Sequence, residues 1–208
     1  MNKIDKELLK RTTIKTLEEY KEKVLLGYIN IDYPNVLEKE ILNFLKMNKN
    51  KNELILCQYY CAVIDGKVES SENSNHIFNV MHDLALKNNV LAQERLGYMY
   101  QFFKDYSDDD YKEALFWYSK AAEQEYDVAE FNVGCFYETG KGIKPNFQKA
   151  VYWYLKAAEQ DNADAQYNLA LLYYNGLGVE KNLEMAKYWC KKALENGNTL
   201  AKDFLTTL

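Results

Sequence analysis

The sequence has little of what turn-rich sheets and catalytic or metal sites are usually built from. Its 208 residues include only 2 proline, 9 glycine and 2 histidine, against 18 tyrosine and 3 tryptophan. Few turn-forming residues and many aromatic ones favour long helices over a sheet protein. With 48% hydrophobic and 27% charged residues, a chain of this length can bury a continuous core, so we do not expect a disordered protein.

Long apolar segments are also lacking. No stretch reaches the roughly 20 apolar residues that a membrane-spanning helix requires. Residues 1–7 are mostly polar and charged and have no apolar core of a secretion signal. We therefore expect a cytoplasmic protein without membrane insertion.

The four cysteines have neither the spacing of a disulfide framework nor that of a zinc finger. Cys57 and Cys61 lie one helical turn apart, whereas Cys135 and Cys190 are isolated. A zinc site would need the ligand set Cys57, Cys61, His76 and His82, which matches no standard spacing. Small buried thiols are the better interpretation, and we expect no cofactor.

Charge is unevenly distributed along the chain. Residues 1–52 carry 11 Lys/Arg and 8 Asp/Glu, a net charge of +3, and the remaining residues carry 15 and 23, a net charge of −8. Such an acidic field disfavours nucleic acid, whose phosphates require a basic surface, and would attract a basic protein. Solubility alone explains the same charge.

The tryptophans reveal an internal repeat. Trp117, Trp153 and Trp189 are 36 residues apart (153 − 117 and 189 − 153). Self-similarity at a fixed period of this length is typical of helical repeat proteins. The sequence around each tryptophan recurs in three aligned segments, 113–124, 149–160 and 185–196.

Each clear copy also contains an upstream helix and a turn. Apolar residues such as Ala129, Val133 and Tyr137 return at every fourth position, which is helical spacing. Gly140 and Gly176 follow these segments, where a left-handed residue can end a helix. Ile143 and Val179 are predicted to pack under their turns, and Asn146 and Asn182 are predicted to cap the next helix.

These segments resemble the Sel-1-like repeats, relatives of the tetratricopeptide repeats. The resemblance covers about residues 53–208 and is clear from residue 92. It implies an all-α fold, a right-handed α-α superhelix (solenoid) of helix-turn-helix repeats, and a protein-binding role. The match is not complete, because Asn146 and Asn182 replace the family's aspartate and the copy at 92–128 lacks both turn glycines.

We divide the chain into an N-terminal helical cap at 1–52 and a repeat domain at 53–208. The repeat domain is expected to contain a degenerate copy at 53–91, copies at 92–128, 129–164 and 165–200, and a C-terminal helix at 201–208. The degenerate copy is aligned with Ala85 on Ala121 and with Met81 in the tryptophan place. Its first helix would contain Leu56, Tyr60 and Cys61.

The copy at 92–128 has a longer, acidic turn. A calcium site at its acidic run, Asp105, Asp108, Asp109 and Asp110, would lack the glycine and the terminal glutamate of a helix-loop-helix site. Helix capping by Asp110 and solvation explain the run equally well. A third possibility is that Asp108 and Asp109 contact a basic partner.

By the tetratricopeptide resemblance, one face of each first helix lines a concave partner-binding groove. The predicted strip combines aromatic rings with a few acids, a composition typical of interface cores. It consists of Tyr59, Glu94, Tyr98, Gln101, Phe102, Phe131, Cys135, Glu138, Thr139, Tyr167, Leu171, Tyr174 and Asn175. The alternative is that these rings pack against the helices of the next repeat.

No arrangement of histidine, paired carboxylates or an activated nucleophile indicates catalysis. We therefore expect a non-enzymatic protein-binding module. Among bacterial relatives some are immunity proteins, so a narrower hypothesis is a cytoplasmic immunity protein that neutralises a basic toxin. An adaptor or scaffold in a signalling or envelope pathway is the main alternative and an enzyme the weakest. The sequence leaves the oligomeric state open.

Overall fold

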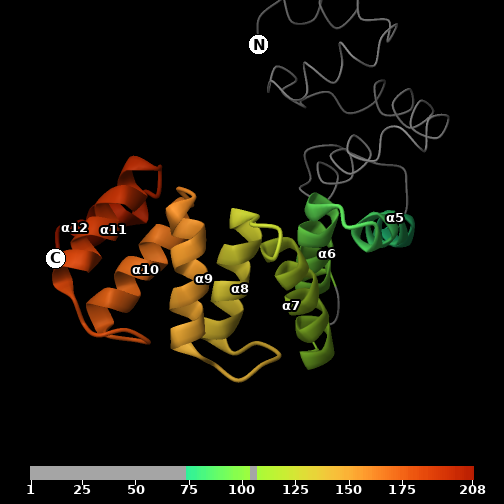
Figure 1. The fold of residues 1–208 in the computed structure, drawn as a ribbon, viewed down its shortest axis with the longest axis horizontal. Helices are drawn as coiled ribbons and strands as arrows, with labels where there is room; N and C mark the ends of the chain where they lie inside the picture. The colour runs from blue at the N-terminus through green and yellow to red at the C-terminus, as the bar shows by residue number, and fades with distance from the viewer. Residues whose placement is uncertain (1–73, 104–106) are drawn as a thin grey trace, which may run out of the picture. The chain divides into compact units, whose positions relative to one another are not determined.

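The computed structural model describes residues 74–103 and 107–208, in which all regular secondary structure is helical (Figure 1). Each helix packs mainly against the helices before and after it in the chain, which confirms the all-α solenoid. The predicted cap at 1–52 lies outside the described residues. The helices are α5 (Ser74–Leu86), α6 (Val90–Phe102), α7 (Asp108–Ala122), α8 (Asp127–Thr139), α9 (Phe147–Glu159), α10 (Ala163–Asn175), α11 (Leu183–Glu195) and α12 (Leu200–Leu205).

Three helical hairpins form the clear repeats, α6 with α7, α8 with α9 and α10 with α11. We call α6, α8 and α10 the first helices and α7, α9 and α11 the second helices. Alanines at equivalent positions of the first helices, Ala92, Ala129 and Ala165, are fully buried. Such small residues let neighbouring helices approach closely, and the larger apolar side chains around them form the core. Among the described helices, none is long and apolar enough to cross a membrane.

The turns of the second and third repeats follow the sequence prediction. Gly140 and Gly176 end α8 and α10 in the left-handed conformation, with φ of 74° and 71°. A side chain is strained at this φ, so glycine is the residue that fits. The predicted residues under the turns, Ile143 and Val179, pack against the core.

The helix caps were predicted correctly for the second and third repeats, and in the first repeat Asp110 takes part in capping but is not the N-cap residue. Asn146 and Asn182 are the N-caps of α9 and α11, and each side chain accepts a backbone N–H bond. In α7 the N-cap is Ser107, and Asp110 completes a capping box from the third helical position. Because α7 starts earlier than α9 and α11, Asp110 lies inside the helix and not at its cap.

The degenerate copy is shifted by one residue from the predicted alignment. The Asn89 N–H donates to the carbonyl of Leu84, as the Tyr126 N–H donates to the carbonyl of Ala121. Leu84 therefore takes the place of Ala121, which the prediction gave to Ala85. The cause is the length of the first repeat: Gln101 and Tyr118 are 17 positions apart, whereas Glu138 and Tyr154 are 16 apart, so counting 36 residues back from Ala121 is wrong by one.

This shift changes the role of Met81. Met81 is fully buried in the place that Tyr118 holds in the next repeat, and Val80 holds the place of Trp117. The prediction that Met81 replaces the tryptophan is therefore wrong. The first-helix residues expected for this copy, Leu56, Tyr60 and Cys61, lie outside the described residues.

Candidate functional site

The predicted binding strip follows the three first helices, and most of its members are partly accessible. The half-buried members are Tyr98, Gln101, Phe131, Cys135, Glu138, Tyr167, Leu171 and Tyr174. Phe102 (46% exposed), Thr139 and Asn175 are exposed, whereas Glu94 is buried. Tyr59 lies outside the described residues.

The aromatic members of the strip pack with one side against neighbouring helices. The Phe131 ring lies 5.8 Å from the ring of Tyr154 on α9. Tyr167 and Tyr174 contact Phe204 of α12, with ring centroids 5.9 and 5.4 Å apart. These rings therefore belong partly to the core and partly to the surface, which combines the two interpretations of the sequence.

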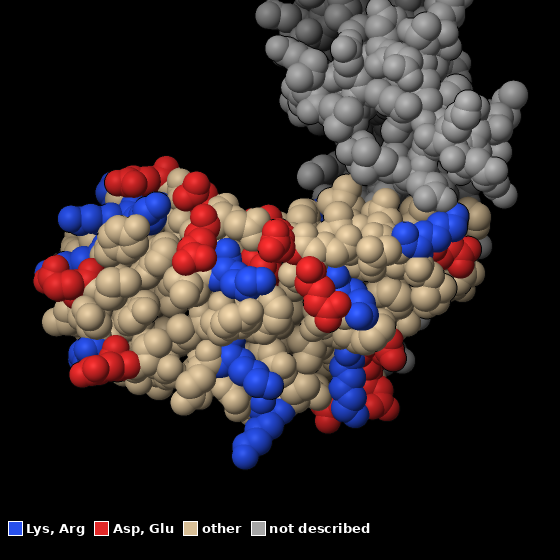
Figure 2. All heavy atoms as spheres, viewed as in Figure 1, with Lys and Arg blue, Asp and Glu red and all other residues tan. Residues whose placement is uncertain are grey.

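Charge differs sharply between the first and the second helices. The first helices contain a single basic residue, Arg95, and five acidic ones, Glu94, Asp127, Glu130, Glu138 and Asp164. The second helices contain seven lysines and seven acidic residues. On the face that Figure 2 shows, charges of both signs are interspersed. The acidic excess is therefore concentrated on the helices that carry the strip.

In the second repeat, a chain of hydrogen bonds orients the carboxylate of Glu138. The buried Tyr154 hydroxyl donates to Glu138 Oε2 over 2.6 Å, and Asn168 Nδ2 donates to the tyrosine oxygen over 3.1 Å. Burial raises the pKa of Tyr154 well above its usual value, so the hydroxyl remains a donor at neutral pH. This arrangement holds Glu138 in one orientation.

Cys135 lies beside the same hydroxyl. Its Sγ is 3.3 Å from the Tyr154 oxygen. Burial, and secondarily the carboxylates of Glu138 and Asp164, raise the pKa of the Cys135 thiol to about 11. The thiol is therefore protonated at neutral pH, and a thiolate nucleophile is not available at this position.

The equivalent positions in the other two repeats are uncharged. In the first repeat, Tyr118 donates to Gln101 Oε1 over 3.0 Å, and Glu94 is paired with Arg95 at 3.3 Å. In the third repeat, Tyr174 takes the place of Glu138, and Cys190 takes that of the buried tyrosine. The oriented carboxylate is therefore particular to the second repeat.

The acidic residues at the start of α7 lie at the surface, Asp108 and Asp109 exposed and Asp110 half-buried, and have local structural roles. Asp109 Oδ1 accepts from Lys112 Nζ over 2.7 Å, and this hydrogen bond lowers the pKa of Asp109. Ser107 Oγ donates to Asp110 Oδ2 over 2.6 Å. Asp108 is exposed next to them, and Asp105 lies outside the described residues. Capping and a surface ion pair account for Asp109 and Asp110.

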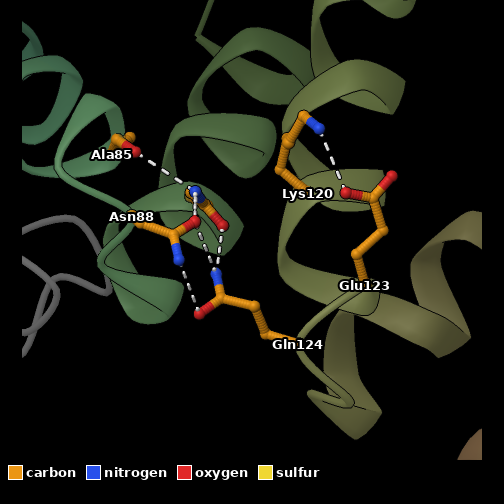
Figure 3. A network of polar contacts seen from close by, with 6 residues as sticks. Ala85, Asn88, Lys120, Glu123 and Gln124 are labelled. Carbon is orange, nitrogen blue, oxygen red and sulfur yellow. Dashed lines mark hydrogen bonds and ion pairs between the residues drawn. The ribbon is translucent and has the colours of Figure 1, made fainter.

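Sequence reasoning missed the amide network that joins adjacent repeats. Gln93 Nε2 donates to the Ala85 carbonyl over 3.1 Å and to Asn88 Oδ1 over 3.1 Å. Gln124 Nε2 in turn donates to Gln93 Oε1 over 2.7 Å (Figure 3). The sequence contained one signal for this network. The residue after the first alanine of each copy is polar although its position is buried, and these residues are Gln93, Glu130 and Gln166.

A row of exposed rings on the second helices was also missed. Phe116, Tyr152 and Tyr188 are 49%, 54% and 48% exposed. Each precedes a repeat tryptophan and packs edge-on against it. Each also lies within about 6 Å of a lysine ammonium one turn later. The regular spacing of the tryptophans would have identified this row.

Comparison with known proteins agrees with the repeat architecture. The Sel1 repeat family model matches residues 90–126, 127–162 and 163–198, together just over half of the 208 residues. A Sel1 repeat protein from Oxalobacter formigenes is similar in structure, with a TM-score of 0.73 and 27% identity over 91% of this chain and 74% of that chain. Among curated protein sequences, none matches this chain.

A second similar structure is a protective antigen present in uropathogenic Escherichia coli strains, which displays the same type of repeat fold. The TM-score is 0.66 and the identity 33%, and the match covers 76% of this chain. It covers only 33% of the antigen, so this chain corresponds to about one third of that protein.

Proposed function

Because this chain belongs to the Sel1 repeat family, whose members typically act as protein-interaction modules, we propose that it is a non-enzymatic protein-binding module. The partner contacts the strip on the first helices α6, α8 and α10. The observation that carries this proposal is the composition of that strip, which combines half-buried aromatic rings with the half-buried carboxylate of Glu138 and contains no lysine or arginine.

The strip has the properties of an interface core. Phe102 is 46% exposed, and Tyr98, Phe131 and Tyr167 each keep part of their ring surface accessible. Aromatic side chains that are already held by neighbours lose little conformational freedom on binding, so more of their contact energy contributes to affinity. The three accessible carboxylates on these helices, Asp127, Glu138 and Asp164, outnumber the one guanidinium and favour a basic partner through electrostatic attraction.

In its narrower form, the proposal is that the protein works in the bacterial cytoplasm and neutralises a basic toxin. The accessible carboxylates of the first helices, Asp127, Glu138 and Asp164, support a basic partner. A scaffold for several partners is the alternative. Growth of cells that produce the captured partner, with and without this chain, distinguishes them: a toxin arrests growth only when the chain is absent.

A site-specific crosslinking experiment tests the binding surface. A photoreactive phenylalanine analogue is placed at Leu171 in the strip or, as a control, at the exposed Tyr152 on α9. The full-length protein is irradiated in its own cells, and the adducts are identified by mass spectrometry. We expect one recurrent adduct from position 171 and none of that protein from position 152.

Affinity measurements with the captured partner complete the test. Tyr98→Ala on α6 is expected to weaken binding by about 10- to 100-fold, the range for a central aromatic contact, whereas Tyr152→Ala on α9 leaves it within about twofold. Equal effects of the two substitutions, with helicity retained, would place the partner elsewhere and refute the proposed surface.

A further inference from the structure

We propose that Glu138 anchors a receptor for one cationic side chain, an arginine or lysine of the bound protein, in the second repeat. The inference deepens the proposed function and rests on it, because the cation belongs to the partner. In this proposal, one position of the strip recognises a single positive charge. Three features of the structure support it.

The first feature is the fixed orientation of the carboxylate. Glu138 Oε2 accepts the 2.6 Å hydrogen bond from Tyr154, and Asn168 holds the tyrosine oxygen from α10. The Tyr154 ring is itself fully buried and packs against Gly134 of α8. A carboxylate that is held by a rigid neighbour keeps a ligand-binding geometry at little entropic cost.

The second feature is the missing counter-charge. Neither α8 nor α10 contains a lysine or arginine. Among the described residues, no ion pair includes Glu138, although Glu94, Asp109, Glu123 and Glu130 are each paired. The group that holds Glu138, the Tyr154 hydroxyl, is a neutral donor, so the negative charge of Glu138 is left for an external cation.

The third feature is the chemical surrounding. Besides burial, which is the larger cause, the carboxylates of Glu138 and Asp164 raise the pKa of the Cys135 thiol, so two negative charges lie near that side chain. The half-buried Phe131 ring lies 5.8 Å from the Tyr154 ring and forms an apolar neighbour on the same strip. A half-buried carboxylate next to aromatic rings is a suitable environment for a guanidinium or ammonium group.

The neighbouring repeats provide internal comparisons. At the position of Glu138, the first repeat has the neutral Gln101, and its carboxylate Glu94 is already paired with Arg95. The third repeat has Tyr174 there. Among the three repeats that the structure describes, the second therefore offers such a receptor and the other two do not.

The probe for the test is acetyl-arginine amide, with acetyl-citrulline amide as its neutral analogue of the same shape. Each is titrated into the full-length protein, and backbone amide signals are followed by NMR. The arginine derivative is expected to shift the signals of Cys135, Glu138 and Asn168 in a saturable manner. The citrulline derivative is expected to leave them in place.

Two matched substitutions locate the site. Glu138→Gln keeps an oxygen acceptor for Tyr154 but removes the charge, and it is expected to weaken binding of the arginine derivative by about tenfold. Glu159→Gln removes an equal charge at an exposed position of α9 and is expected to change binding by less than about twofold. Circular dichroism verifies that both variants remain folded.

The proposal is overturned if both derivatives shift the same signals, if the shifts centre on another acidic group such as Asp108 and Asp109, or if Glu138→Gln binds like the wild type. The crosslinking result at Leu171 does not depend on this outcome. A partner captured by the strip together with an unresponsive Glu138 would refute the receptor while leaving the proposed function intact.

Discussion

Two glutamates of the second repeat lie where the neighbouring repeats have uncharged residues, and the two differ in burial and in their contacts. Glu130 replaces Gln93 and Gln166 in the junction between repeats and is fully buried. Glu138 replaces Gln101 and Tyr174 on the strip and is half-buried. The two side chains are identical and lie on the same helix, α8.

The difference lies in what surrounds each carboxylate. Glu130 Oε2 accepts from Gln160 over 2.7 Å, and its Oε1 lies 3.3 Å from Lys156 without a hydrogen bond among the described residues. The charge of Glu130 is thus compensated in part inside the protein. Glu138 is held by one neutral donor, the Tyr154 hydroxyl, and keeps its charge for a ligand. Compensation makes a buried carboxylate structural, and its absence makes an accessible one available for binding.

The largest expected effect comes from disturbing the packing of Tyr154, whose hydroxyl orients Glu138. A Cβ at position 134 would lie 2.5 Å from the Tyr154 ring, which cannot move because it is fully buried. We expect Gly134→Ala to lower the free energy of unfolding by about 2 kcal/mol, even though alanine favours helix more than glycine does. Urea denaturation measures the change.

The third repeat suggests the control for this substitution. It has Ala170 at the position of Gly134 and the smaller Cys190 at that of Tyr154. The double variant Gly134→Ala with Tyr154→Cys should recover a large part of the lost stability, but without the hydroxyl that orients Glu138. A double variant that is less stable than Gly134→Ala would contradict this packing argument.

A smaller effect is expected when Glu130 is replaced by glutamine, the residue at the equivalent positions Gln93 and Gln166. Gln166 Nε2 donates to the Ala158 carbonyl over 2.9 Å, and a glutamine at position 130 can donate in the same way to Ala122. We expect Glu130→Gln to raise the free energy of unfolding at pH 8 by about 1 kcal/mol. Thermal denaturation measures it, and the reverse substitution Gln166→Glu should destabilise.

The stabilisation by Glu130→Gln should depend on pH. Burial raises the pKa of Glu130 in the folded state, outweighing the opposing effects of Lys156 and Gln160. The stability that this shift contributes is therefore complete below the pKa of the unfolded chain and is lost as the pH rises through the folded pKa. The variant's advantage should shrink as the pH falls toward 5. An advantage that grows on acidification would reverse the assigned direction.

The smallest expected effect on stability comes from a glutamate placed in the first repeat, at the position equivalent to Glu138. Gln101→Glu introduces a carboxylate where Tyr118 already donates a hydrogen bond. Because position 101 is half-buried at the surface, the free energy of unfolding should change by less than about 0.5 kcal/mol. The variant should gain a second set of NMR shifts with acetyl-arginine amide, around residue 101. A single set at Glu138 would show that the carboxylate alone is not sufficient.

The elements of the repeats could be predicted from sequence because their causes are local. Gly140 and Gly176 end helices, and Asn146 and Asn182 begin them, through contacts within a few residues. The register of the degenerate copy was missed, because the prediction counted back by the 36-residue tryptophan period, whereas the first repeat is one residue longer than the second. The strip was located from helical spacing, but its half-buried state depends on contacts such as that between Tyr167 and Phe204.

The 36-residue period, the helical hairpins, their turns and the family follow from the sequence alone, since each depends on spacing and on neighbours along the chain. Which acidic residues are compensated and which are oriented for binding depends on the contacts between stacked helices. The partner of Glu138 is 16 positions away and that of Glu130 is 30 positions away, each on another helix. Burial and charge compensation arise from such distant contacts, so identical residues acquire different roles only after the repeats have stacked.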